Sequence, residues 1–196
     1  YLFEKYVNSQ DINAMLLCIK HSNMEAIGLT TVVERWIKNS IGQNADQRTN
    51  TNNSFFFVMT FFDQHLVDTA ANESETDRFT RRIHSSLLEK FGRLPDSWPL
   101  SWSMSANKSV PFDNCYWLRN PGVAQSYFTR KNGIEELSSN STEDIRISQI
   151  KDMHSKTEEV ITHFKDPSKA WDAVMQGNDG GVSYILRELS KVCSSE

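Results

Sequence analysis

Three short runs of mainly apolar residues divide the chain into its main parts. They cover residues 13–19, 54–60 and 115–118. A continuous apolar run of this length is typical of a strand that is buried on both faces, as in a parallel sheet. The pattern therefore predicts three strands, each without a solvent-exposed face.

Two amphipathic helices are predicted between these strands. The apolar positions of the first share one helical face, and the pattern ends near Gly42. They are Leu29, Val32, Val33, Trp36 and Ile37. The second helix has an apolar residue at every fourth position and ends at Gly92. These residues are Phe79, Ile83, Leu87 and Phe91.

Two segments between the predicted elements have the composition of loops. Residues 43–53 are polar and predict a connecting loop. Residues 93–112 predict a long irregular loop, and loops of that length are often functional. Trp98 and Trp102 lie in it; we expect them to pack on the core, and a lid is the alternative.

Beyond the third strand, residues 141–195 have a helical pattern throughout. A 3-4 spacing of mainly apolar residues predicts the seam of a helix that packs on another helix. The seam consists of Ile147, Ile150, His154, Thr157, Ile161 and Phe164. Asp166 and Pro167 predict the start of a further helix, and residues 178–181, Asn-Asp-Gly-Gly, predict a turn before the last one.

The alternation of strands and helices indicates an α/β fold with a parallel sheet. We expect a partial three-layer sheet of about three strands over residues 1–140, followed by a helical region, residues 141–196, that packs on it. Three strands leave an open sheet edge, so the missing partner strands are expected upstream in a longer chain. A small flavodoxin-like domain with a five-stranded sheet is the alternative.

Net charge, the length of apolar stretches and cysteine spacing disfavour several classes of protein. The net charge of −4 gives no basic footprint for nucleic acid, and no apolar stretch has the length of a membrane span. Cys18, Cys115 and Cys193 are widely spaced and odd in number, which disfavours disulfides and zinc. Cys18 and Cys115 are expected to be buried apolar side chains in a reducing compartment. The five histidines show no metal spacing, and His84 and His154 are expected at the core or its edge.

Candidate binding residues follow the predicted strands, because ligands of open α/β sheets bind at the carboxyl ends of strands. Thr60 and Asp63 match the spacing of the Asn/Thr-Lys-x-Asp motif with which GTPases bind guanine, but Phe61 replaces the lysine. Asn120 follows the third strand. The alternatives are that Asp63 only ends its strand and that Asn120 only forms a turn before Pro121.

No sequence for binding phosphates accompanies these candidates. The chain lacks Gly-x-x-x-x-Gly-Lys-Ser/Thr, so we predict no catalytic residue, no metal site and no cofactor for this chain alone. Residues 105–108 resemble the Ser-Ala-Lys loop of GTPases with one insertion, but they precede the third strand and are a weak candidate.

Several runs together resemble bacterial virulence factors of the SrfC type. The most specific runs are residues 111–121, with the pattern Pro-Phe-x-Asn-x-x-Trp-Leu-Arg-Asn-Pro, and residues 178–184, Asn-Asp-Gly-Gly-Val-Ser-Tyr. Residues 1–6, 16–18 and 60–63 also match. The resemblance spans the chain and implies a P-loop NTPase-like domain whose phosphate-binding motifs precede this segment.

The resemblance leads to two functional hypotheses. In the first, this chain supplies the base side of a nucleotide pocket through Thr60, Asp63 and Asn120. GTP or ATP and Mg²⁺ would then be bound in the full-length protein, together with the upstream half. In the second, the chain is a non-catalytic interaction module of a secretion or virulence complex, with the helices of residues 143–193 as the docking surface. A bacterial cytoplasmic location is implied, with secretion as an effector as the alternative.

Overall fold

A computed structural model describes residues 13–20, 28–67, 77–121, 127–138 and 141–193. Its centre is a parallel sheet in the order β1 (Met15–Ile19), β2 (Phe55–Met59) and β5 (Cys115–Trp117). The mixed α/β class and the three predicted strands are confirmed, and the described residues contain no further strand in this sheet. Residues 1–6, which also carry the family resemblance, lie outside the described residues.

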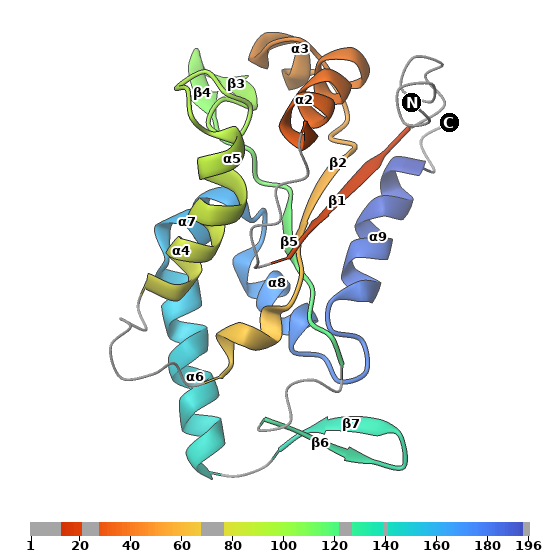
Figure 1. The fold of residues 1–196 in the computed structure, drawn as a ribbon, viewed down its shortest axis with the longest axis vertical. Coiled ribbons are helices and arrows are strands. Elements are labelled where there is room, and N and C mark those ends of the chain that lie inside the picture. The colour runs from red at the N-terminus through yellow and green to blue at the C-terminus, as the bar shows by residue number, and fades with distance from the viewer. Residues whose placement is uncertain (1–12, 21–27, 68–76, 122–126, 139–140, 194–196) are drawn as a thin grey trace.

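Helices cover both faces of this sheet (Figure 1). Side chains of β2 alternate between the two faces, as the pleat of a strand requires. Phe55, Phe57 and Met59 join a large core with Trp36 and Trp171. On the opposite face, Phe56 and Val58 join a smaller core with Ile185 of α9 (Val182–Cys193) and Tyr116 of β5. The sheet is therefore the middle of three layers.

Strand β1 differs from the prediction that all three strands are buried on both faces. Leu16 is 39% exposed and Cys18 is exposed, although Met15 and Ile19 are buried. The expected burial of Cys18 is wrong because α9 lies over β2 and β5 and leaves this face of β1 uncovered. Within the described residues, β1 is hydrogen-bonded to β2 alone, so its other edge is open.

Two helices pack the main core beside the sheet. Helix α2 (Leu29–Ser40) buries Val33, Trp36 and Ile37, as its pattern predicts. Residues 78–91 form α4 (Arg78–Ile83), a π-helical segment η3 (His84–Leu88) and α5 (Glu89–Phe91). A four-residue apolar spacing overshoots a 3.6-residue turn, and the wider π turn compensates. All four predicted apolar side chains are therefore buried: Phe79, Ile83, Leu87 and Phe91.

The two predicted loops contain short elements that the pattern does not reveal. Helix α3 (Ala45–Thr49) lies in the first. The second contains a hairpin of β3 (Ser103–Ser105) and β4 (Lys108–Val110). Its turn holds Ala106 and Asn107 at positive φ, so residues 105–108 form a hairpin turn. Trp98 and Trp102 are buried, which confirms that they pack on the core.

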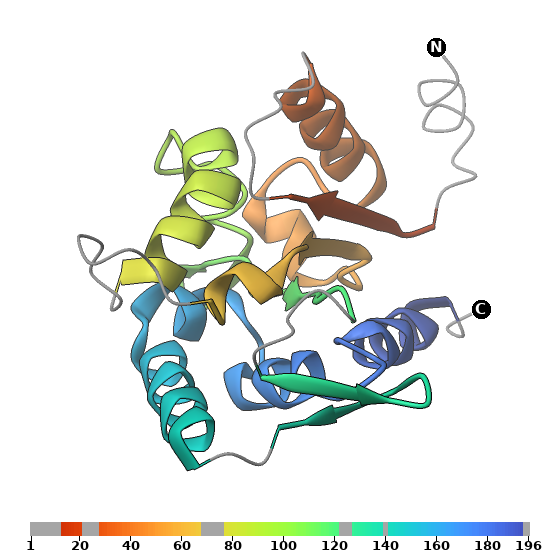
Figure 2. The same cartoon turned by 60° about the horizontal axis from the view of Figure 1, so that its bottom comes forward.

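A second hairpin lies between the sheet and the final helices. It consists of β6 (Phe128–Lys131) and β7 (Ile134–Leu137), joined by Asn132 and Gly133 at positive φ. Asn-Gly is a strong signal for a two-residue hairpin turn, and the sequence analysis missed it. Figure 2 shows the hairpin beside the chain that joins α8 to α9.

The last part of the chain is helical, as predicted, but the predicted seam does not form a separate surface. Helices α6 (Ser141–Lys156) and α7 (Glu158–His163) are separated by Thr157, whose backbone is extended. Ile150, His154 and Phe164 are buried in the main core, whereas Ile161 is 58% exposed. The break at Thr157 turns Ile161 away from the others.

The remaining predictions for this region agree with the structure. Asp166 caps α8 (Pro167–Val174) by accepting a hydrogen bond from the Lys169 N–H at 3.0 Å. His154 is buried, and His84 lies at the edge, where it contacts Glu159. None of the described helices combines the length and apolar character needed to cross a bilayer.

Candidate functional site

The predicted site residues lie at the carboxyl ends of β2 and β5. After β2 the chain passes through Thr60 and Phe61 into the 3-10 helix η1 (Phe62–His65), which carries Asp63. The backbone N–H of Asn120, which follows β5, donates to Asp63 Oδ2 at 3.1 Å. The fold thus brings two of the three predicted residues together across 57 positions of sequence.

Thr60 lies at the carboxyl end of β2 and is hydrogen-bonded to the neighbouring end of β1. Its backbone N–H and its Oγ1 both donate to the carbonyl of Ile19, at 2.9 and 3.1 Å. The hydroxyl therefore fastens the end of β2 to the end of β1. Within the described residues, no hydrogen bond joins the Thr60 side chain to Asp63 or Asn120, so Thr60 contributes to this edge by holding the two strand ends together.

Asp63 is buried with only part of its hydrogen-bonding capacity used. The residue is 2% exposed, and its Oδ1 has no hydrogen-bond partner among the described residues. Burial raises the pKa of the carboxyl group, while the Asn120 N–H and the positive charge of Arg119 act in the opposite direction. One carboxylate oxygen is thus committed to the fold, and the other is left to accept a hydrogen bond.

Phe61, which replaces the lysine of the GTPase motif, has an unusual backbone and an exposed ring. Its φ of 60° and ψ of 42° lie in the left-handed region, which is strained for a bulky residue. The side chain is 41% exposed. Strained residues cluster at ligand sites, so this observation adds Phe61 to the candidate site.

Arg82 is a site residue that the sequence analysis missed. It lies on α4 and is 1% exposed. Its Nη2 donates to the carbonyls of Ile19 and Thr60, at 2.8 and 3.1 Å. The guanidinium group therefore lies against the carboxyl ends of β1 and β2. An arginine three residues after Phe79, on the apolar face of an amphipathic helix, was the available signal.

A second buried arginine, Arg119, anchors the β6–β7 hairpin. Its Nη1 and Nη2 donate to the two carboxylate oxygens of Glu135 at 2.8 and 2.7 Å. Its Nε donates to the Val174 carbonyl, and its guanidinium lies 3.8 Å from the centre of the Phe128 ring. Such a bidentate, desolvated pair holds one geometry. It joins β5, the hairpin and α8.

The turn at residues 178–181 closes this cluster. The backbone N–H of Asn178 donates to Glu135 at 3.0 Å, and the Arg119 N–H donates to the Gly180 carbonyl at 2.9 Å. A Cβ atom at Gly181 would lie 2.7 Å from the Trp117 carbonyl oxygen. The two runs that carry the family resemblance, residues 111–121 and 178–184, are therefore in direct contact, and their arginine and glycines have a structural role.

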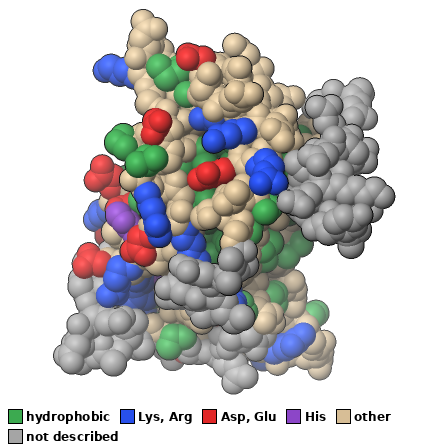
Figure 3. Space-filling model, turned by 45° about the horizontal axis from the view of Figure 1, so that its top comes forward, with side chains coloured by type: hydrophobic (Ala, Val, Ile, Leu, Met, Phe, Trp, Pro, Cys, Tyr) green, Lys and Arg blue, Asp and Glu red, His purple; other side chains and the backbone are tan. Residues whose placement is uncertain are grey.

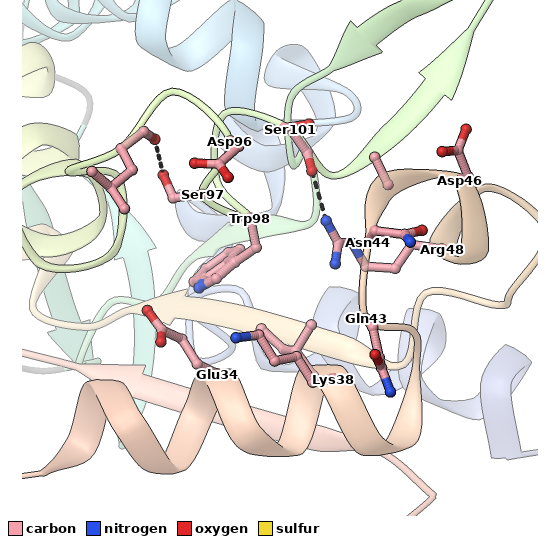
Figure 4. A pocket seen from close by; sticks show the side chains of 13 residues that line it. Glu34, Lys38, Gln43, Asn44, Asp46, Arg48, Asp96, Ser97, Trp98 and Ser101 are labelled. Carbon is pink, nitrogen blue, oxygen red and sulfur yellow. Dashed lines mark hydrogen bonds between the residues drawn. The ribbon is translucent and has the colours of Figure 1, made fainter.

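A cavity of about 450 Å³ lies at the other end of the sheet, near the amino ends of the strands. Figure 4 shows Glu34 and Lys38 of α2 facing Trp98 and Asp96 across it. Arg48 lies at its wall, where Nε, Nη1 and Nη2 each donate to a backbone carbonyl. Acidic and basic side chains are interspersed on this side of the molecule (Figure 3), without a wide basic patch among the coloured atoms.

Neither location has the composition of a metal centre. The described residues contain no group of three or more His, Cys, Asp or Glu side chains that could hold a metal ion. The carboxyl edge offers instead one unpartnered carboxylate oxygen, an exposed aromatic ring and a buried guanidinium group. These groups suit an organic ligand that carries hydrogen-bond donors, a flat ring and negative charge.

Comparison with known proteins gives one match. The model of a family described as "Putative bacterial virulence factor" matches residues 1–196, which is the whole chain. No curated protein sequence and no solved structure matches it.

Proposed function

Since this chain belongs to that family, we propose that it forms the base side of a nucleotide pocket. The observation that carries this proposal is the meeting of Asp63 and Asn120 at the carboxyl edge of a parallel sheet, where α/β proteins bind nucleotides. Asp63 Oδ1 is the acceptor for an N–H group of the base. Thr60 holds the adjoining strand ends in register.

The open edge of β1 supports a pocket that is completed by another part of a longer protein. A parallel strand added there would continue the sheet and would cover the unpaired edge. Leu16 and Cys18 are exposed beside this edge. In the proposal, the added part carries the P-loop that binds the phosphates and Mg²⁺ of GTP or ATP.

The replaced lysine bears on which base is bound. In the GTPase motif, the lysine stem covers the sugar and base, and the aspartate accepts two hydrogen bonds from guanine. Here Phe61 offers an aromatic face instead, and base stacking on an aromatic ring contributes about 1–3 kcal/mol without selecting one base. We therefore propose modest discrimination between guanine and adenine nucleotides.

Nucleotide titration with Asp63 variants tests the proposal. Asp63→Asn keeps the shape of the side chain, and its carbonyl oxygen can still accept the Asn120 N–H. In isothermal titration calorimetry, we expect it to weaken GDP binding by about tenfold, because a hydrogen bond to a charged acceptor contributes about 1.5–3 kcal/mol. Equal affinities for wild type and Asp63→Asn, with both proteins folded, would contradict a role for Asp63 in base binding.

A second candidate function is a non-catalytic interaction module of a bacterial cytoplasmic or secreted complex. The observation in its favour is that Ile145 of α6 and Ile161 of α7 are 61% and 58% exposed. Ile150 cannot belong to such a surface because it is fully buried. Ile161→Asp should leave folding intact and weaken partner binding, whereas Ile150→Asp should unfold the protein. Unchanged partner binding in Ile161→Asp would exclude α7 as an interface.

A further inference from the structure

Four arginines are buried in the described part of the chain. Arg78 donates to the backbone carbonyl of His65, and the other three differ in how their charge is compensated. Arg48 donates from each of its side-chain nitrogens to a backbone carbonyl. Arg119 is paired with the carboxylate of Glu135. Arg82 is the most completely buried of the four. Its Nε and Nη1 have no hydrogen-bond partner among the described residues.

No carboxylate in the described part of the chain compensates the charge of Arg82. Its two acceptors are the backbone carbonyls of Ile19 and Thr60. Both are neutral, and both accept a hydrogen bond from the same nitrogen, Nη2. Burial lowers the pKa of Arg82 to about 10 and is the sole cause of the shift. A buried cation with unused donors is strongly unfavourable unless an anion is supplied.

The position of Arg82 indicates what that anion is. The guanidinium lies where β1 and β2 end, on the sheet edge that also carries Asp63. Phosphate groups are the usual anions at this edge of α/β sheets. A guanidinium group matches their oxygens in geometry and remains charged when buried.

We propose that Arg82 binds a phosphate group of a nucleotide at the carboxyl ends of β1 and β2. The proposal rests on the proposed function of this edge and extends it, because it places one phosphate contact within this chain. Asp63 then serves the base and Arg82 the charged part of the same ligand. The unused Nε and Nη1 donate to phosphate oxygens, and the dry surroundings keep this attraction from being weakened by solvent.

The test uses the 196-residue chain, the variant Arg82→Met, and three probes measured by calorimetry: GDP, guanosine and inorganic pyrophosphate. We expect Arg82→Met to weaken GDP and pyrophosphate binding by about tenfold or more and to leave guanosine binding unchanged. If wild type binds GDP no more tightly than guanosine, or if Arg82→Met weakens neither GDP nor pyrophosphate, the inference is overturned.

The probes also separate this inference from the proposed function. Pyrophosphate binding that depends on Arg82, without any guanosine binding, supports the phosphate site and contradicts the base pocket. If wild type binds guanosine and Arg82→Met does not change the binding of any probe, the base pocket is supported and the phosphate site is contradicted. Absence of binding by all three probes overturns both.

Thermal unfolding without ligand provides the folding control. Arg82→Met removes an uncompensated charge, so its Tm should be equal to or higher than that of wild type. Arg119→Met is the matched control, because it removes the guanidinium group that pairs with the buried carboxylate of Glu135 and should lower Tm markedly. A Tm loss in Arg82→Met as large as that in Arg119→Met would show that Arg82 is structural and would overturn the proposal.

Discussion

At the scale of single residues, the protein buries polar groups in specific ionisation states. The indole Nε1 of Trp117 donates to His154 Nε2 at 2.9 Å. The imidazole must therefore be neutral, with its proton on Nδ1. Burial and, to a smaller extent, the nearby positive charge of Lys151 together lower the pKa of His154 from 6.5 to about 3.

This histidine makes the stability of the fold depend on pH. In the unfolded chain His154 takes up a proton below about pH 6.5, whereas in the folded protein it stays neutral down to about pH 3. The stabilisation is therefore complete above pH 6.5 and decreases as the pH falls towards 3. We expect a loss of about 2 kcal/mol between about pH 7 and pH 5 from this residue.

His154→Gln tests this prediction, because glutamine can accept the Trp117 hydrogen bond but does not titrate. Urea unfolding of both proteins should show a smaller decrease of the unfolding free energy in the variant between these pH values. Other titrating groups are common to the two proteins and cancel in the comparison. The same pH dependence in both would show that His154 is not the group responsible.

At the scale of elements, the turn between α8 and α9 depends on close backbone approach. Gly181 has a φ of +102°, and a Cβ there would lie 2.7 Å from the Trp117 carbonyl oxygen. Asp179 then accepts hydrogen bonds from the N–H groups of Gly181 and Ser183 at the start of α9. The turn thus sets where α9 begins and how closely it approaches β5.

Two glycine variants separate strain from steric clash. Gly133 also has a positive φ of +81°, but a Cβ there would meet nothing within 4 Å. We expect Gly133→Ala to cost about 1–2 kcal/mol of unfolding free energy from strain alone, and Gly181→Ala at least about twice as much. Equal losses in urea unfolding would mean that the backbone beside Gly181 relaxes freely.

At the scale of the whole molecule, one edge of β1 has no partner strand among the described residues. An open strand edge with Leu16 exposed beside it is a template for association with another chain. We expect the isolated protein to self-associate, and Leu16→Lys to reduce this by placing a charge next to the edge. Sedimentation velocity measures the change.

A matched control distinguishes the edge from general hydrophobicity. Leu94 is 64% exposed and lies away from β1, at the cavity near the amino ends of the strands. Leu94→Lys should leave self-association unchanged, and both variants should keep the wild-type unfolding free energy within about 0.5 kcal/mol. Equal effects of the two variants would contradict an edge-specific contact.

Much of the architecture was predictable because it depends on local pattern. Apolar runs predicted the strands, and the spacing of Phe79 to Phe91 predicted a helix, although its π turn required the packed structure. The break at Thr157 escaped prediction, because the 3-4 spacing continues through it and only the tertiary position of Ile161 differs. The exposure of Cys18 was missed for a similar reason: α9 is distant in sequence.

The amino-acid sequence by itself determined the class of the fold, the three strands and the carboxyl edge at which Asp63 and Asn120 lie. These depend on the periodicity of side chains and on the common direction of parallel strands. Only the tertiary structure decided that Asp63 accepts from Asn120, that Arg119 pairs with Glu135 and that Arg82 is buried with no counter-charge among the described residues. Charge compensation depends on which distant groups the fold brings within a few ångströms, and this information is absent from any local stretch of sequence.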